Sequence, residues 1–534
     1  MYSTRSVRSS RATCNSGQQI DSRHAAREDV CVFGLDAITV RTKVGRIGTT
    51  GSNIAKPLVG QPEQDGSGQR NESKYGVEQL QTNLLENGRL QCYACAGLDR
   101  NRREARRYKG KGRWSEDSCL VPRRQLPTHA GDVYTPSVTA PREYDPYSYE
   151  IDDDPYPTYR WMRDEAPAYY NERLDFYALT RFDDNLAAFI DAETYSSFHS
   201  TSLEFMDGPK PDSGLMIWMD PPEHNRYRAL VSKAFTPRQI GKIEQSVHDV
   251  AVGHLETLVD RDRFDIVEEF TSRLPMDVIS SLLGIPPSER RWLQERSNTM
   301  LHRDPGNPMP REDALEAQTE VHDFIHEQMN ERRTQPRDDL MTRLVEVELT
   351  EEDGRRVNLR DHDVKMFIIL LATAGNETVT KLLAAMYLDL WRFPGERARL
   401  LDDPSLVENA VEEGLRFETP SQYQGRVTTR SVELHGKTIP TGARILLINA
   451  AANRDERKFP DPDRFDVGRE IDLHLALGYG RHSCLGAFLA RMESRIGIEE
   501  LLKRFPDYRI PEDGIERMHS SNVRGLAGLT MEVG

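Results

Sequence analysis

The sequence predicts a mainly α-helical fold with small β-sheets. Apolar residues recur at helical spacing through most of residues 140–534, and the longest such segment runs from Asp361 to Phe393. Short runs that alternate apolar and polar residues, bounded by glycine or proline, occur in only a few places and predict brief strands. No internal repeat is present, and a chain of 534 residues is long enough to bury a large core.

Residues 1–130 differ in composition from the rest of the chain. They carry 22 Lys and Arg against 13 Asp and Glu, a balance of +9, whereas the remaining residues carry a balance of −24. They are rich in Ser, Gly, Gln, Asn and Arg, so we expect a low-order basic extension. An alternative is a mis-assigned translation start, with the true start near Val133 or Val138. Cys92 and Cys95 have zinc-knuckle spacing, but no second pair follows, so we expect no metal there.

Cysteine usage and hydropathy predict a cytoplasmic protein without a membrane span. Five of the six cysteines precede residue 130, so Cys484 is alone in the folded part and cannot form a disulfide within it. The N-terminus lacks the apolar core of a signal peptide. The longest apolar run has about ten residues, and roughly 18 are needed to cross a bilayer. The acidic balance after residue 130 also excludes a nucleic-acid partner, because phosphate binding needs a concentrated basic face.

The first part of the folded region predicts three short helices and two strands. Proline in a first turn, or an acidic residue at the N-terminus, marks helix starts near Asp154, Asp183 and Asp220, with Asp183 as an N-cap. Between the first two helices, apolar residues alternate in two expected strands, at residues 168–171 and 175–179.

The second part is expected to be almost entirely helical as far as residue 417. Its longest segment would span roughly 50 Å at 1.5 Å per residue. Because the first half of that segment is apolar nearly all round, we predict a buried central helix. The expected elements are helices at residues 264–284, 288–347 (broken at 305–310), 361–393 and 403–417, and hairpin strands at 432–434 and 445–448.

A single cysteine lies in a glycine-rich loop directly before a helical pattern. Gly478, Gly480 and Gly486 surround Cys484, and their lack of a side chain lets a large flat partner approach the main chain. Just before a helix, the helix dipole and unpaired amides favour a thiolate over a thiol. Such a thiolate is a nucleophile or a metal ligand, and a buried core thiol is the structural alternative. The loop alone does not decide among these three.

Polar residues interrupt the predicted central helix at Gly375-Asn376-Glu377-Thr378. Residues of this kind are unfavourable inside a buried helix, and such departures from local preference are expected at functional sites. Glu377 and Thr378 could relay protons into a cavity. The structural alternative is a kinked helix in which the Thr378 hydroxyl bonds back to a carbonyl one turn earlier and Glu377 forms a salt bridge.

Arginine and histidine side chains supply candidate anion-binding groups. His224 and Arg228 are four residues apart, hence on one helix face, and could contact an anion together; an ordinary exposed pair is the alternative. Arg426 and His482 are further donors whose placement cannot be read from their spacing.

Residues from about 144 to 534 resemble the cytochrome P-450 superfamily, the haem-thiolate monooxygenases, and its soluble bacterial members in particular. The family's cysteine loop reads Phe-x-x-Gly-x-Arg/His-x-Cys-x-Gly, and Gly480, His482, Cys484 and Gly486 fall in step with it. Leu477 departs from the pattern, since the family usually has Phe at that position. The other matching motifs are Ala374-Gly375-x-Glu377-Thr378, Glu413 with Arg416, Asn453-Arg454-Asp455, and the segment from Phe459 to Phe465.

The resemblance implies the cytochrome P-450 fold, in which the long central helix lies over a haem b. It implies that Cys484 is the thiolate ligand of the haem iron, and that Glu377 and Thr378 deliver the protons that oxygen activation consumes. It also implies that Glu413, Arg416 and Arg464 form a structural charge triad. The residues that match haem-propionate donors are His224, Arg228, Arg426 and His482.

The resemblance therefore implies a haem-dependent monooxygenase, located in residues 140–534, that inserts one atom of O2 into a hydrophobic organic substrate. Electrons would come from NAD(P)H through a ferredoxin reductase and a ferredoxin. Arg457, Lys458 and Arg481 lie near the cysteine loop in sequence and are candidates for docking an acidic ferredoxin. The alternatives are a peroxide-dependent haem peroxygenase, which needs no proton relay, and a haem sensor or carrier without turnover.

Overall fold

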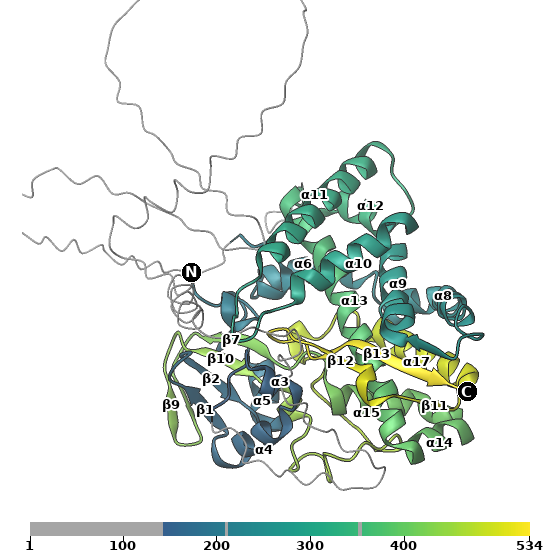
Figure 1. Ribbon diagram of the computed structural model, residues 1–534. Helices are drawn as coiled ribbons and strands as arrows, with labels where there is room; N and C mark the ends of the chain where they lie inside the picture. Colours follow the sequence, from purple (N-terminus) through teal and green to yellow (C-terminus); the bar gives the residue numbers. More distant parts are fainter. Residues whose placement is uncertain (1–142, 209–211, 351–354) are drawn as a thin grey trace, which may run out of the picture. The chain divides into compact units, whose positions relative to one another are not determined.

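The computed structural model describes residues 143–208, 212–350 and 355–534, which form a mainly helical unit with small sheets (Figure 1). This architecture confirms the predicted fold class. The expected basic extension at residues 1–130 and its cysteine pair lie outside the described residues.

Helices make up most of the described chain, and one-turn helices (η) link several of them. They are α3 Tyr149–Asp153, α4 Tyr156–Glu165, α5 Phe182–Ile190, η1 Leu203–Phe205, η2 Met216–Trp218, α6 Glu223–Ser232, α7 Pro237–Ile240, η3 Gly241–Ile243, α8 Glu244–Glu256, η4 Val267–Thr271, α9 Arg273–Leu283, α10 Pro287–Leu301, α11 Glu312–Thr334, α12 Leu340–Val345, α13 Asp361–Arg392, α14 Pro394–Asp402, η5 Pro404–Leu406, α15 Val407–Glu418, α16 Asn449–Ala452, η6 Gly480–His482, α17 Ala487–Arg504 and η7 Glu512–Gly514.

The strands form two larger sheets and two hairpins. A five-stranded sheet has the order β1-β2-β10-β7-β3, in which β10 runs parallel to β2 and antiparallel to β7. A second sheet is built on β13, which pairs with β11, β12 and β4; β5–β6 and β8–β9 are hairpins. The strands are β1 Ala168–Asn171, β2 Phe176–Leu179, β3 Tyr195–Ser196, β4 Arg263–Asp265, β5 Glu348–Thr350, β6 Arg356–Asn358, β7 Gln424–Thr428, β8 Val432–Leu434, β9 Lys437–Ile439, β10 Arg444–Leu447, β11 Tyr508–Arg509, β12 Ile515–Met518 and β13 Gly525–Val533.

The predicted central helix is α13, whose 32 residues match the expected segment to within one residue. It packs against α9, α11, α15, α17 and β13, and Figure 1 shows it among these elements. Among the described residues it is the one helix long and apolar enough to cross a bilayer, and 67% of its most apolar stretch is buried inside the fold. Its apolar character therefore serves the core.

Three local predictions are wrong. Strand β10 does not form a hairpin with residues 432–434, which pair with β9, but pairs with β2 and β7. The expected helix at residues 264–284 begins with strand β4, because Phe264 is buried in register with Met531 of β13. The Asp265 carboxylate then accepts from the Val267 N–H and starts a single π-helical turn before α9. Gly284 ends α9 as predicted, with φ 79°. Asp183 lies in the first turn of α5 and does not cap it.

The predicted charge triad is present, but its third member is different. Glu413 and Arg416 are fully buried and 2.6 Å apart. The side chain of Arg464 is 61% exposed and faces Asp466, whereas Arg469 Nε lies 3.2 Å from Glu413 Oε1. Arg464 contributes only its carbonyl oxygen, which accepts from Arg416 and Arg469. The loop turns the Arg464 side chain outward, which motif spacing alone does not reveal.

One buried acid, Glu493 of α17, has no hydrogen-bond partner for either carboxyl oxygen among the described residues. Burial raises its pKa well above the usual value. A raised pKa gives a stability contribution that is present at low pH and lost as pH rises toward the folded-state pKa. Glu493→Gln should therefore raise the free energy of unfolding by about 1–3 kcal/mol at pH 8 and by less at pH 5, measured by urea denaturation. Glu499→Gln, a partly exposed position of the same helix, should show no such pH-dependent gain.

Candidate functional site

The cysteine loop is fixed by backbone geometry that requires glycine. Gly480 has φ 68°, and a Cβ atom there would lie 2.7 Å from the Phe189 carbonyl oxygen of α5. The Cys484 N–H donates to the Leu477 carbonyl at 2.8 Å, and α17 begins three residues later. Cys484 thus lies just before a helix, as predicted. Leu477 packs against the hydrophobic core of the helical region.

The surroundings of the Cys484 sulfur oppose the thiolate that the helix dipole is expected to favour. Cys484 keeps accessible surface although many protein atoms surround it. Burial raises the pKa of the thiol, and this outweighs the opposing effects of the Gly486 N–H, Arg228 and Arg491. A metal ion bound at the sulfur would lower the pKa of the thiol and favour the thiolate.

The four predicted anion-binding residues converge beside the cysteine loop from α6, β7 and η6. The rings of His224 and His482 lie 4.0 Å apart, centroid to centroid. His224 is only 1% exposed, so the alternative of an ordinary exposed pair is wrong for it. Arg228 Nη2 lies 3.5 Å from the Ser483 hydroxyl, next to the cysteine. Both ring nitrogens of His224, and Nε2 of His482, are buried without a partner among the described residues.

The electrostatics of this cluster call for an anion. Burial, followed by the charges of Arg426, His224 and Arg228, lowers the pKa of His482 to about 2. Burial also lowers the pKa of Arg426 to about 10, and Asp220 only partly opposes it. Arg426 Nη1 donates to the Gly425 carbonyl, but three histidine nitrogens have no partner among the described residues, and unpartnered buried polar groups are costly. The cluster therefore keeps unused hydrogen-bonding capacity. Two carboxylates would satisfy it, and haem carries two propionates.

Removing the charge of Arg426 is expected to stabilise the apoprotein and to weaken haem binding. Its charge destabilises the haem-free fold, so Arg426→Met should raise the free energy of unfolding of the apoprotein by about 1–3 kcal/mol. The same change should weaken haem binding, because a charge-assisted hydrogen bond is lost. Urea denaturation of the apoprotein and haem titration measure the two effects. Arg430→Met, an exposed position just after β7, should alter neither.

The polar residues of α13 combine features of both sequence interpretations. The Thr378 hydroxyl donates to the Ala374 carbonyl at 3.0 Å, and Glu377 Oε2 lies 3.4 Å from Lys381 Nζ. These are the back-bond and the salt bridge of the structural alternative, yet α13 continues unbroken through this point. Ala374 and Thr378 keep accessible surface, whereas Glu377 is buried. The hydroxyl therefore lies on the open side of the helix and the carboxylate on the packed side.

Lys381 is a functional candidate that the sequence reasoning missed. It is buried, and its ammonium donates to the Leu526 carbonyl of β13 at 3.0 Å as well as facing Glu377. A Cβ atom at Gly525 would come within 2.5 Å of the Lys381 stem, so β13 leaves room for this side chain. The signal in the sequence was a lysine one turn after Glu377 in an otherwise apolar stretch.

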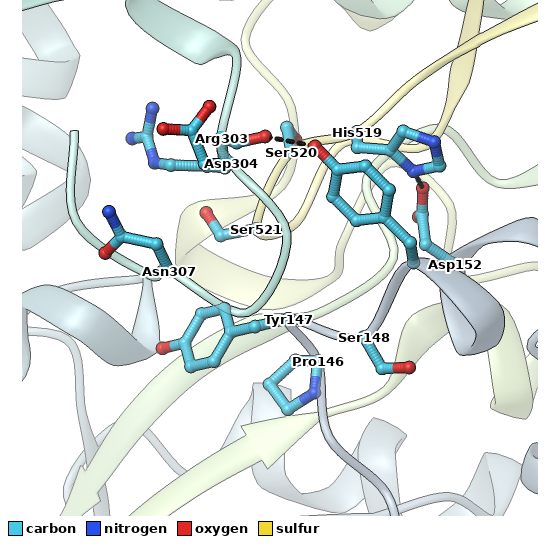
Figure 2. Close-up of a pocket in the computed structure, with 11 residues that line it drawn as sticks. Pro146, Tyr147, Ser148, Asp152, Arg303, Asp304, Asn307, His519, Ser520 and Ser521 are labelled. Carbon is cyan, nitrogen blue, oxygen red and sulfur yellow. Dashed lines mark hydrogen bonds and ion pairs between the residues drawn. The ribbon is translucent and has the colours of Figure 1, made fainter. Parts of the chain in front are cut away.

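A separate small pocket lies between α3, the loop after α10 and the β12–β13 turn (Figure 2). The Tyr149 hydroxyl donates to the Arg303 carbonyl at 2.5 Å, and His519 lies 2.8 Å from Asp152. The pocket has room for about one water molecule, and no predicted site residue lines it. The described residues contain no cluster of three or more His, Cys, Asp or Glu that could hold a metal ion by itself.

Comparison with known proteins identifies the family. The Cytochrome P450 family profile matches residues 398–527. The putative cytochrome P450 123 of Mycobacterium tuberculosis is 41% identical over 392 residues, which cover 73% of this chain and 96% of that protein. The vitamin D(3) 25-hydroxylase of Pseudonocardia autotrophica is 34% identical over 405 residues, covering 74% and 98%.

Solved structures agree with these relatives. The crystal structure of CYP109E1 from Bacillus megaterium in complex with testosterone matches with a TM-score of 0.66 and 28% identity, over 72% of this chain and 99% of that one. Nearly the whole length of each relative is thus aligned, and the one cysteine of the described residues lies beside the incompletely hydrogen-bonded rings of His224 and His482. The chain therefore belongs to the cytochrome P450 family and is a haem-dependent monooxygenase.

Proposed function

We propose that residues 140–534 bind haem b through Cys484 and insert one atom of O2 into a hydrophobic organic substrate in the cytoplasm. The observation that carries this proposal is the pair of buried histidine rings, His224 and His482, three of whose nitrogens lack hydrogen-bond partners beside the only cysteine in the described residues. Mass analysis of a product formed under isotopically labelled O2 tests it. One labelled oxygen per product supports the proposal, and label from water or added peroxide counts against it.

In this proposal each residue has a distinct task. His224, Arg228, Arg426 and His482 hold the propionates, and Cys484 ligates the iron. Bound haem supplies the iron that activates O2. Thr378 presents its hydroxyl on the accessible face of α13, where it orients and passes protons. The Glu377 carboxylate faces Lys381 on the packed side of α13. It therefore has to turn away from Lys381 before it can supply a proton to Thr378.

Electrons would arrive from NAD(P)H through a ferredoxin and its reductase. Phe488 of α17 is 50% exposed beside the cysteine loop, and three exposed cations lie on or beside the neighbouring α6, α7 and η3: Lys233, Arg238 and Lys242. An exposed apolar side chain together with exposed cations on neighbouring elements fits an acidic partner. The earlier candidates are weaker, because Arg457 pairs with Asp164 and Lys458 with Asp472. Arg481 is exposed, and its Nη1 donates to the Asn225 side chain at 3.3 Å, so it stays a candidate.

The substrate is proposed to be a polycyclic or similarly apolar molecule. The structural neighbour from Bacillus megaterium holds testosterone, and the relative from Pseudonocardia autotrophica is named for vitamin D(3). A panel of steroids, fatty acids, terpenoids and aromatics, followed by the shift of the haem Soret band on binding, tests this class. Tight binding of fatty acids alone would contradict it.

Two other functions remain distinguishable by experiment. A peroxygenase would form product with peroxide at least as fast as with NAD(P)H and ferredoxin, and a sensor or carrier would bind haem and ligand without product. The Glu377-Thr378 pair supports the O2-dependent reaction, since peroxide already carries both protons. NAD(P)H consumption that depends on substrate and ferredoxin separates all three.

A further inference from the structure

Glu412 of α15 connects the two ends of the cysteine loop. Its carboxylate forms a two-point contact with Arg491 of α17, with Nε at 2.6 Å and Nη2 at 2.9 Å. The same carboxylate lies 3.1 Å from Nε2 of His474, which opens the segment that leads into the loop. Cys484 lies between these two attachment points in the chain, ten residues after one and seven before the other.

The hydrogen-bond geometry fixes the role of each partner. Nδ1 of His474 accepts from the Ala476 N–H at 3.2 Å, so the neutral ring carries its proton on Nε2 and donates it to Glu412. Although burial opposes ionisation, the donors Arg491 and His474 lower the pKa of Glu412 to about 2. Glu412 is thus a permanent anion with three donors from two separate segments.

The anchor itself is rigid. The adjacent residue, Glu413, forms a fully buried ion pair with Arg416, and α15 packs directly against α17. The arm before the cysteine has one further attachment, from the Leu475 N–H to Asn453 Oδ1 at 2.7 Å. Loss of Glu412 would release Arg491 and one side of His474 together, and would leave the Arg491 charge free near the sulfur.

We propose that Glu412 is a positioning residue for the cysteine ligand: it holds both arms of the loop against α15 and so fixes the sulfur relative to the haem iron. This inference rests on the proposed role of Cys484 as haem ligand. Glu412 touches neither cofactor nor substrate, and it acts through His474 and Arg491.

The test uses the haem-loaded full chain and the variant Glu412→Gln, which keeps the shape and removes the charge. Glu408→Gln, an exposed position one turn earlier on α15, is the matched control. Urea unfolding is followed by far-ultraviolet circular dichroism and, in parallel, by the thiolate-type Soret band of the reduced, CO-bound haem. The rate of haem transfer to excess apomyoglobin is measured without urea.

In Glu412→Gln we expect the thiolate band to disappear at lower urea than the helical signal, and haem transfer to be about tenfold faster, equivalent to about 1.4 kcal/mol. The two transitions should coincide in the wild type and in Glu408→Gln. If the thiolate band and the helical signal of Glu412→Gln are lost at the same urea concentration, whether or not that concentration differs from the wild type, the inference is wrong. Should Glu412→Gln fail to fold, Arg491→Lys, which keeps the cation but loses the two-point contact, must separate the transitions in the same direction. A wild type without any thiolate band would overturn the proposed function instead.

Discussion

Replacing Cys484 with serine is expected to abolish O2-dependent product formation and to remove the thiolate-type Soret band. A serine hydroxyl does not ionise at neutral pH, so it cannot supply the thiolate whose electron donation favours O–O cleavage. The fold should persist, because residue 484 ties the loop through its main-chain N–H to the Leu477 carbonyl. Product per bound haem, the spectrum of the reduced CO complex and far-ultraviolet circular dichroism measure these three outcomes.

A matched control exists within the chain. Replacing all five cysteines before residue 130 with serine should leave the band and the activity intact, because Cys484 is the cysteine that lies in the family's haem-loop motif. A Cys484→Ser protein that keeps the thiolate band would show that another residue ligates the iron. Loss of the band in the five-cysteine variant would assign a role to the extension.

Sequence periodicity predicted the elements whose structure depends on local pattern. The segment 361–393 became α13, and the alternation at residues 168–171 became β1, because side-chain spacing decides which face of such an element is buried. The same argument failed near Phe264. There a strand is stabilised by pairing with β13, more than 260 residues later, and no local pattern contains that information.

The site was predictable in its residue types and not in its geometry. His224 and His482 are 258 residues apart, and only the fold brings their rings together. The family motif placed Arg464 in the charge triad, but the loop path gives that place to Arg469. The helix dipole favours a thiolate at Cys484, but burial of the sulfur, which no local pattern reveals, raises the pKa of the thiol.

Thr378→Ala is expected to separate NAD(P)H consumption from product formation. Electron delivery does not pass through this side chain, so consumption should continue, whereas product formation should fall by about 100-fold because the proton-passing hydroxyl is lost. The reducing equivalents should appear as hydrogen peroxide. Product, NAD(P)H and peroxide measured in the same reaction show how the reducing equivalents divide between product and hydrogen peroxide.

The chain provides a close control for this change. Thr373 lies on the same helix, is also partly accessible, and its hydroxyl bonds back to the Ile369 carbonyl at 2.9 Å, as that of Thr378 does to Ala374. If back-bonding were the whole role of Thr378, as the structural alternative holds, Thr373→Ala and Thr378→Ala would have similar effects on α13 and on coupling.

Peroxide-driven turnover decides between a relay and a structural role for the pair. Peroxide brings its own protons, so Thr378→Ala and Glu377→Gln should slow the NAD(P)H-driven reaction far more than the peroxide-driven one. Glu377→Gln also removes the anion that faces buried Lys381, and an unpaired buried ammonium is costly, so this variant should lose stability as well. Lys381→Met should restore that stability in the double variant without restoring coupling. Equal loss of both reactions in Thr378→Ala would leave Thr378 a structural residue of α13.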